Sequence, residues 1–279
     1  MGATRDTPPI PGVINEELPR LQAELARDKP MRLDSGETIG PFTAAYTTCG
    51  HLNADKSNVV LICHALTGDQ YVLENNPLTN KPGWWQLMVG PGKPLDTDRY
   101  FFVCINVLGG CMGSTGPKDT NPDTNKPWGL EFPVITIGDM VRAQSLLLDH
   151  LGIDQLHAVA GPSVGGLAAL TFATNFPERV RTIISIASGI RTTVLNRLIL
   201  FEQILAIEND PHFNGGDYYE AQHPDIGLAL ARMISHKTFV HLDAIERRAR
   251  RDVLQQEDVL SWYQVRDPFQ SYMLYQGKK

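Results

Sequence analysis

Short apolar segments alternate with helical periodicity in the middle of the chain, and this alternation constrains the fold more than any other feature. The apolar segments are bounded by polar and turn residues, as is typical of strands buried on both faces. They cover residues 59–63, 101–105, 157–160 and 182–187. Apolar residues at helical spacing fill 137–151 and 164–176, between the last three segments. This order is typical of right-handed βαβ units and predicts an α/β domain with a mostly parallel sheet.

The strand-like segments are confined to residues 31–190, which we predict to form the core domain. Residues 1–30 mix prolines with charged residues and are predicted to be a polar extension containing a short helix over 16–27. After Gly189 the strand pattern stops. Residues 191–279 favour helices over 195–207, 226–234 and 239–254, and we expect this helical region to form a lid above the strand ends.

Composition excludes several classes of partner. The net charge is −6, so a broad basic surface for nucleic acid is not expected. No apolar run has the length of a signal peptide core or of a membrane-spanning helix. Cys63 and Cys104 lie in apolar segments and are predicted to be buried thiols. These observations predict a cytoplasmic protein that binds neither nucleic acid nor membrane.

The sequence GPSVG at residues 161–165 places a serine between a predicted buried strand and a predicted helix. This context is that of the nucleophile elbow of the α/β-hydrolase fold, in which small neighbours are needed because the turn is tight. We therefore predict Ser163 to be a nucleophile, with the N–H of Val164 facing a developing oxyanion. The alternative is a glycine-rich turn with an incidental serine.

An oxyanion hole needs a second donor, which this fold takes from the loop after an earlier strand. The segment HALTG at 64–68 follows the strand predicted at 59–63, and the N–H of Leu66 is our candidate. His64 precedes the nucleophile, whereas the order in this fold is serine, acid, histidine. We therefore predict that His64 fixes the loop by hydrogen bonds and is not the catalytic base.

Three further segments leave alternatives open. The glycine-rich loop 106–117 is either a place of close approach to a ligand or a long connection, and its spacing is not that of a P-loop. Arg232 could clamp a carboxylate from the lid, although the residues alone favour an arginine at a helix edge. The basic cluster 246–252 is predicted to be a solvated helix face, with contact to an anionic cofactor as the alternative.

Taken together in chain order over residues 31–277, these segments resemble the homoserine O-acetyltransferase family. The matching motifs are YTTCG at 46–50 with Leu52-Asn53, CHALTGD at 63–69, KPGWW at 81–85, the loop 106–117, EFP at 131–133 with Asp139-Met140, residues 161–166, Asp210-Pro211 with Gly216 and Tyr218-Tyr219, and Gly227-Leu228 with Ala231-Arg232.

The resemblance implies an α/β-hydrolase fold and a double-displacement reaction. Ser163 would take the acyl group from acetyl-CoA and pass it to the hydroxyl of L-homoserine, a step of methionine biosynthesis. The backbones of Leu66 and Val164 would form the oxyanion hole, and Arg232 would hold the carboxylate of the amino acid. Acetyl-CoA would be a co-substrate, with no bound cofactor or metal. We also predict a homodimer that forms through the lid helices.

The chain departs from the family pattern at several positions. Val164 stands where methionine is usual, Phe239 where tyrosine is frequent, and Gly138 where arginine is common. The family continues after the equivalent of Gly277 into strands that supply an aspartate and a histidine. Two more βα units need at least ~60 residues, whereas two lysines remain here. We therefore expect a truncated form with an uncovered sheet edge, in which Ser163 is poorly activated.

Other functions remain open at this point. The same fold with another donor or acceptor would be a homoserine O-succinyltransferase, a serine O-acyltransferase or a simple ester hydrolase. A chain without its base could also act as a non-catalytic partner subunit.

Overall fold

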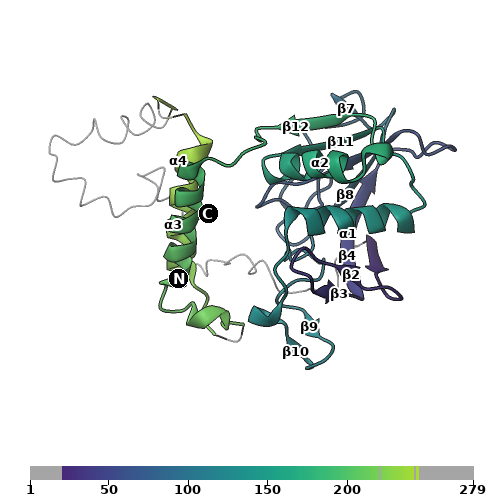
Figure 1. Ribbon diagram of the computed structural model, residues 1–279. Helices are drawn as coiled ribbons and strands as arrows, with labels where there is room; N and C mark the ends of the chain where they lie inside the picture. The colour runs from purple at the N-terminus through teal and green to yellow at the C-terminus, as the bar shows by residue number, and fades with distance from the viewer. Residues whose placement is uncertain (1–20, 220, 242, 245–279) are drawn as a thin grey trace, which may run out of the picture. The chain divides into compact units, whose positions relative to one another are not determined.

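The computed structural model describes residues 21–219, 221–241 and 243–244 (Figure 1). The chain divides into two units, residues 1–190 and 191–279. The strands all lie in the described part of the first unit: β1 Leu21–Leu25, β2 Met31–Arg32, β3 Thr38–Ile39, β4 Phe42–Cys49, β5 Val59–Ile62, β6 Val89–Gly90, β7 Leu95–Asp96, β8 Phe101–Ile105, β9 Thr120–Asn121, β10 Lys126–Pro127, β11 Ala158–Pro162 and β12 Ile183–Ile186. The helices are η1 Gly129–Glu131, α1 Ile137–His150, α2 Val164–Asn175, η2 Pro177–Arg179, α3 Val194–Glu208, η3 Asn214–Gly216 and α4 Asp225–Phe239.

A six-stranded sheet organises the first unit, in the order β1-β4-β8-β5-β11-β12. Strands β8, β5, β11 and β12 run parallel to one another, and β4 and β1 extend the sheet in antiparallel pairs. The α/β class with a mostly parallel sheet is therefore confirmed. The carboxyl ends of β5, β8 and β11 lie at the same edge, so the loops that follow them meet there.

The central strands carry continuous apolar runs because both faces of the sheet are covered. Along β5, Val59 and Leu61 belong to the core on one face, whereas Val60 and Ile62 belong to the core on the other. Helices α1 and α2 lie side by side over the first face (Figure 1) and contribute Leu147 and Phe172 to its core. On the second face, the connection between β5 and β8 supplies apolar residues such as Val72 and Val89. Cys63 and Cys104 are buried, as predicted.

The prediction of a short helix over residues 16–27 is wrong where the structure describes it, because Leu21–Leu25 is strand β1. It pairs antiparallel with β4, from Leu21 opposite Tyr46 to Leu25 opposite Phe42. Ala23 and Leu25 are buried between exposed neighbours, which is the two-residue period of a strand. This short segment is a strand because it pairs with the free edge of the sheet at β4. Its own sequence does not reveal that partner. Residues 16–20 lie outside the described part.

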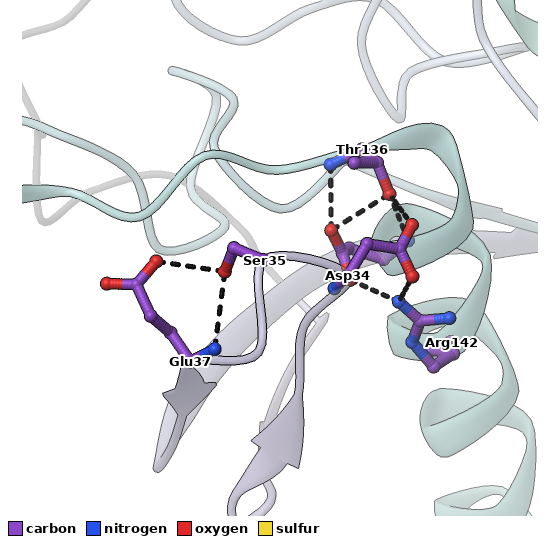
Figure 2. Close-up of polar contacts among 6 residues, drawn as sticks. Asp34, Ser35, Glu37, Thr136 and Arg142 are labelled. Carbon is purple, nitrogen blue, oxygen red and sulfur yellow. Dashed lines mark hydrogen bonds and ion pairs between the residues drawn. The ribbon is translucent and has the colours of Figure 1, made fainter.

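A polar cluster ties the β2–β3 turn to the start of α1. Thr136 caps this helix in a capping box with Asp139, whose buried carboxylate also accepts a hydrogen bond from the backbone N–H of Asp34 at 3.0 Å. Figure 2 shows the Asp34 carboxylate beside the Thr136 hydroxyl and the Arg142 guanidinium, and it is hydrogen-bonded to both. These bonds lower the pKa of Asp34. A Cβ atom on Gly138 would lie 2.8 Å from this carboxylate, so the glycine leaves room for Asp34.

In the second unit, α3 and α4 pack against each other. The buried Asp210 carboxylate joins their ends by accepting hydrogen bonds from the N–H groups of His212 and Gly227, at 2.9 and 2.7 Å. These bonds hold the pKa of Asp210 below its usual value. A Cβ atom on Gly227 would lie 2.4 Å from the carbonyl oxygen of Ala206, so glycine is needed for the close approach of the two helices. Neither helix, nor any other in the described residues, could cross a membrane.

Candidate active site

Ser163 is the single residue between the end of β11 and the start of α2. Its φ and ψ angles are 55° and −118°, a region that residues with a side chain rarely adopt. Such a conformation persists only where neighbouring structure enforces it, and it is found most often at functional sites. The strand–turn–helix setting predicted for the nucleophile elbow is therefore present at Ser163.

The backbone of Ser163 is held by four hydrogen bonds. Its N–H donates to the carbonyl of Ile186 at the end of β12, at 2.9 Å. Its carbonyl accepts from the N–H groups of Gly166 and Leu167, at 2.9 and 3.1 Å, and from the Ser188 hydroxyl. The side chain, by contrast, is exposed and makes no capping bond to the helix. The hydroxyl is thus available for chemistry while its backbone is fixed.

The glycines around Ser163 are required by close packing. A Cβ atom on Gly165 would lie 2.0 Å from the carbonyl oxygen of Cys63, and one on Gly161 would lie 2.5 Å from the backbone of Gly165. These distances are far shorter than any van der Waals contact. The first turn of α2 can therefore rest against the end of β5 only because both positions lack a side chain.

The two predicted oxyanion donors lie near this contact, Val164 at the start of α2 and Leu66 in the loop after β5. The backbone of Cys63 and His64 lies against Gly165, one residue after Val164, and Leu66 follows two residues after His64. Among the described residues, neither the N–H of Leu66 nor that of Val164 donates to another protein group. Unpaired N–H groups at a helix start are suited to a developing negative charge. Their joint role stays a prediction.

His64 is buried, with 3% of its surface exposed, and both of its ring nitrogens are engaged. Nδ1 lies 2.8 Å from the carbonyl oxygen of Ala65, and Nε2 accepts a hydrogen bond from the N–H of Val107 at 3.2 Å. Burial lowers the pKa of His64. A neutral histidine with both nitrogens occupied does not serve as the base for Ser163, so the predicted loop-fixing role agrees with the geometry.

The glycine-rich loop 106–117 is ordered by its own polar groups. The Asn106 side-chain oxygen accepts from the N–H of Met112 at 3.3 Å, and the Asn106 carbonyl accepts from the Ser114 hydroxyl. Ser114 also accepts from the N–H of Ala45 on β4, at 3.0 Å. A Cβ atom on Gly110 would lie 2.8 Å from the Asn106 side chain, so at least this glycine serves the internal fold of the loop.

Arg232 lies on α4, in the second unit, and is partly buried. Its proposed contact with the carboxylate of an amino acid stays a prediction. Phe239, where the family often has tyrosine, is the last residue of the same helix. The basic cluster 246–252 lies outside the described residues.

Sequence reasoning did not find the residues that hold the elbow from the side of β12. Ser188 donates to the carbonyl of Ser163, and Ser185 donates to that of Gly166 at 3.3 Å. Two serines at the end of an apolar strand were the available signal, but small hydroxyl residues are common at strand ends. Only the parallel pairing of β12 with β11 brings them to Ser163.

Comparison with known proteins agrees with this geometry. The profile of the alpha/beta hydrolase fold family matches residues 58–265. A homoserine O-acetyltransferase from Rhodospirillum rubrum is 51% identical over 256 residues, which are 91% of this chain and 65% of that protein. A homoserine O-acetyltransferase from Mesorhizobium japonicum is 45% identical, over 95% of this chain and 69% of its own length.

Among solved structures, the crystal structure of esterase E22 aligns with a TM-score of 0.81 at 30% identity and covers 93% of this chain and 72% of its own. The chain thus spans about two thirds of the length of these proteins. It belongs to the α/β-hydrolase fold family and, within it, to the family of homoserine O-acetyltransferases.

Proposed function

We propose that this protein transfers an acetyl group from acetyl-CoA to the hydroxyl of L-homoserine through an acetyl-Ser163 intermediate. The observation that carries the proposal is the Ser163 hydroxyl, exposed on a fixed backbone next to Val164, whose N–H, like that of Leu66, donates to no other group among the described residues. These are the parts that acyl transfer requires, namely a nucleophile and donors for the oxyanion. The relatives named homoserine O-acetyltransferase indicate an acetyl group and homoserine as its acceptor, and acetyl-CoA is the donor that the family resemblance implies.

In the first half-reaction, the Ser163 oxygen attacks the thioester carbonyl and loses its proton. The resulting oxyanion accepts hydrogen bonds from Leu66 and Val164, and the C–S bond then breaks to release protonated CoA. In the second half-reaction, the homoserine hydroxyl attacks the acetyl-serine ester and gives up its own proton, which passes to the Ser163 oxygen as the ester bond breaks and O-acetylhomoserine leaves. Arg232 is proposed to hold the homoserine carboxylate, and the second unit, which the sequence predicts to be a lid, to exclude water from the ester.

Activation of Ser163 also requires a base. His64 is occupied by two hydrogen bonds, and the described histidines after Ser163 (His212, His223, His236 and His241) belong to the second unit, where no strand is described. None of the described acidic residues or histidines after Ser163 lies in a loop that directly follows a sheet strand, where this fold places its acid and its histidine. We propose that a polypeptide of these 279 residues, assayed alone, acylates Ser163 slowly.

We also propose an oligomeric state and a cellular location for the protein. Helix α3 has no buried residue and exposes several large apolar side chains, namely Val194, Leu195, Leu198, Leu200, Phe201, Ile204 and Leu205. An exposed apolar surface of this kind favours association, and we propose a homodimer formed through α3 and α4. We further propose that the protein acts in the cytoplasm, in methionine biosynthesis.

Mass spectrometry of intact protein mixed with acetyl-CoA tests the central claim. We expect one acetyl group on a peptide containing Ser163, accumulating over a slow first turnover and discharged by L-homoserine. Ser163→Ala should abolish the adduct, and Thr174→Ala, which removes an exposed hydroxyl near the other end of α2, is the matched control. Acetylation of the Ser163→Ala variant at the same rate would contradict the proposal.

Hydrolysis of simple esters is the second candidate function, since esterase E22 is similar in structure. Discharge of acetyl-Ser163 separates the two reactions: an acyltransferase discharges faster with homoserine than in water, whereas an esterase discharges equally in both. Succinyl-CoA and L-serine, supplied in place of acetyl-CoA and homoserine, test the remaining donors and acceptors.

A further inference from the structure

The loop that carries Leu66 is fastened at both ends to the same neighbouring loop. At its start, His64 Nε2 accepts from the N–H of Val107 at 3.2 Å. At its end, the side-chain amide of Gln70 donates to the carbonyl of Met112 at 2.9 Å. Val107 and Met112 both belong to the glycine-rich loop 106–117. Residues 64–70 are therefore attached to a second loop at two points, 43 and 42 residues away along the chain.

The two fastening side chains are deeply buried, with His64 3% and Gln70 1% exposed. Leu66 between them has 73% of its surface exposed, so its own side chain contributes little to holding the loop. A buried hydrogen bond is costly to break, because the partner that remains loses its contact without gaining water. The position of the Leu66 backbone therefore depends mainly on its fastened flanks.

The geometry also assigns the proton on His64. An N–H group donates to Nε2, so Nε2 must carry a lone pair, and the proton of the neutral ring lies on Nδ1. This proton faces the carbonyl oxygen of Ala65, which lies 2.8 Å from Nδ1. The two contacts specify the same tautomer, and a doubly protonated ring would place two donors against each other at Val107.

The loop that receives these bonds is itself anchored in the sheet. Its Ser114 accepts from the N–H of Ala45, and its Thr115 accepts from the N–H of Thr43 at 2.8 Å, both on β4. The N–H of Met112 donates to the Asn106 side chain. The glycine-rich loop thus links β4 to residues 64–70 and provides a rigid support for them.

We propose that His64 and Gln70 are positioning residues, which clamp residues 64–70 to the glycine-rich loop and so hold the N–H of Leu66 where the oxyanion forms. The inference rests on the proposed acyl transfer for its catalytic consequence. It gives the glycine-rich loop a defined role as the support of the oxyanion hole. Neither residue touches substrate in this assignment; both act through the backbone of Leu66.

Protonation of His64 should release the clamp. Burial lowers the pKa of His64 and outweighs two effects that raise it, the hydrogen bond to the Ala65 carbonyl and the negative charge of Asp69. Because the folded-state pKa lies below the usual histidine value of about 6.5, the contribution of His64 to stability is complete above that pH. It is lost as the pH falls through the folded-state pKa, and the Val107 bond is lost with it.

Two substitutions distinguish the hydrogen bond at Nε2 of His64 from the one at Nδ1. His64→Gln places an acceptor near the position of Nε2 and can keep the bond from Val107, whereas His64→Asn reaches only the position of Nδ1. We expect His64→Asn to lower the first-turnover rate of Ser163 acetylation by about 10- to 100-fold, because a misplaced oxyanion donor has effects of that order. His64→Gln should recover most of this loss, and His157→Gln, at the amino end of β11, should leave the rate unchanged.

Readouts independent of activity accompany the kinetics. In the wild type, ¹⁵N NMR of the imidazole should show a neutral ring protonated on Nδ1 at pH 7. Hydrogen–deuterium exchange should be faster in residues 64–70 and 106–112 of His64→Asn and Gln70→Met, with α1 unchanged. Absence of acetyl-Ser163 in the wild type would refute the proposed function. The NMR and exchange measurements would still test whether His64 and Gln70 hold the loop in place. A proton on Nε2, or unchanged exchange in both variants, would refute the clamp.

Discussion

At the scale of single residues, the site depends on positions where a side chain is excluded as much as on those where one is needed. Ser163 has an exposed hydroxyl because its backbone bonds to β12 and to the first turn of α2 fix a conformation that residues with side chains rarely adopt. Gly165 permits that turn to rest on Cys63. The strained backbone of Ser163 and the missing Cβ of Gly165 are therefore both needed for the same tight turn.

Gly165→Ala should therefore be more harmful than its single added methyl group suggests. The new Cβ would lie 2.0 Å from the backbone carbonyl of Cys63, and a backbone atom cannot swing aside as a flexible side chain does. We expect the free energy of unfolding to fall by about 2 kcal/mol or more. Denaturant titration followed by circular dichroism measures it.

Thr174→Ala, on the exposed side of the same helix, is the matched control. The Thr174 hydroxyl bonds back to the carbonyl of Thr171, an interaction that slightly disfavours a helix. This variant should be neutral or slightly more stable. If Gly165→Ala unfolds at the same denaturant concentration as the wild type, the close packing of α2 on β5 is not as described.

At the scale of elements, polar contacts specify where α1 begins and what it is attached to. Its capping box satisfies the first N–H groups, and the same two residues bind Asp34 in the β2–β3 turn. One cluster thus fixes both the start of the helix and its attachment to a distant turn (Figure 2). The sequence predicted the helix from its periodicity, but the role of Asp34 depends on a contact across 102 residues.

Thr136→Ala removes the cap and one partner of Asp34. We expect a loss of about 1 kcal/mol in the free energy of unfolding, the usual effect of losing a threonine N-cap. Thr136→Ser retains the hydroxyl and should recover most of this loss, which thermal unfolding of the three proteins can measure. Equal destabilisation by both variants would show that the threonine methyl group, and not the hydroxyl, is the stabilising group.

At the scale of the whole molecule, β12 is the outermost strand of the described sheet on the side of β11. All four of its residues are exposed, including three isoleucines. Ser185 faces α2, so Ile184 and Ile186 lie on the opposite face. An apolar edge strand of this kind is a template for pairing with another chain.

We therefore expect a polypeptide of these 279 residues to unfold broadly at low temperature and to associate with increasing concentration. Ile184→Lys places a charge on this strand, at a residue with 39% of its surface exposed, and should reduce the association without lowering the unfolding temperature. Light scattering across a concentration series, with calorimetry, measures both. A sharp transition at high temperature in the unmodified chain would contradict this expectation.

The strands β5, β8, β11 and β12, the helices α1 to α4 and the elbow at Ser163 could be predicted from the sequence, because each depends on a pattern within one short segment. Periodicity of two or 3.6 residues, and small residues between a strand and a helix, are local signals. The pairing of β1 with β4, the bonds of Ile186 and Ser188 to Ser163, and the choice of Val107 as the partner of His64 could not be predicted in this way. They join residues that strand order and sheet register bring together, and neither order nor register is encoded within any one of those segments.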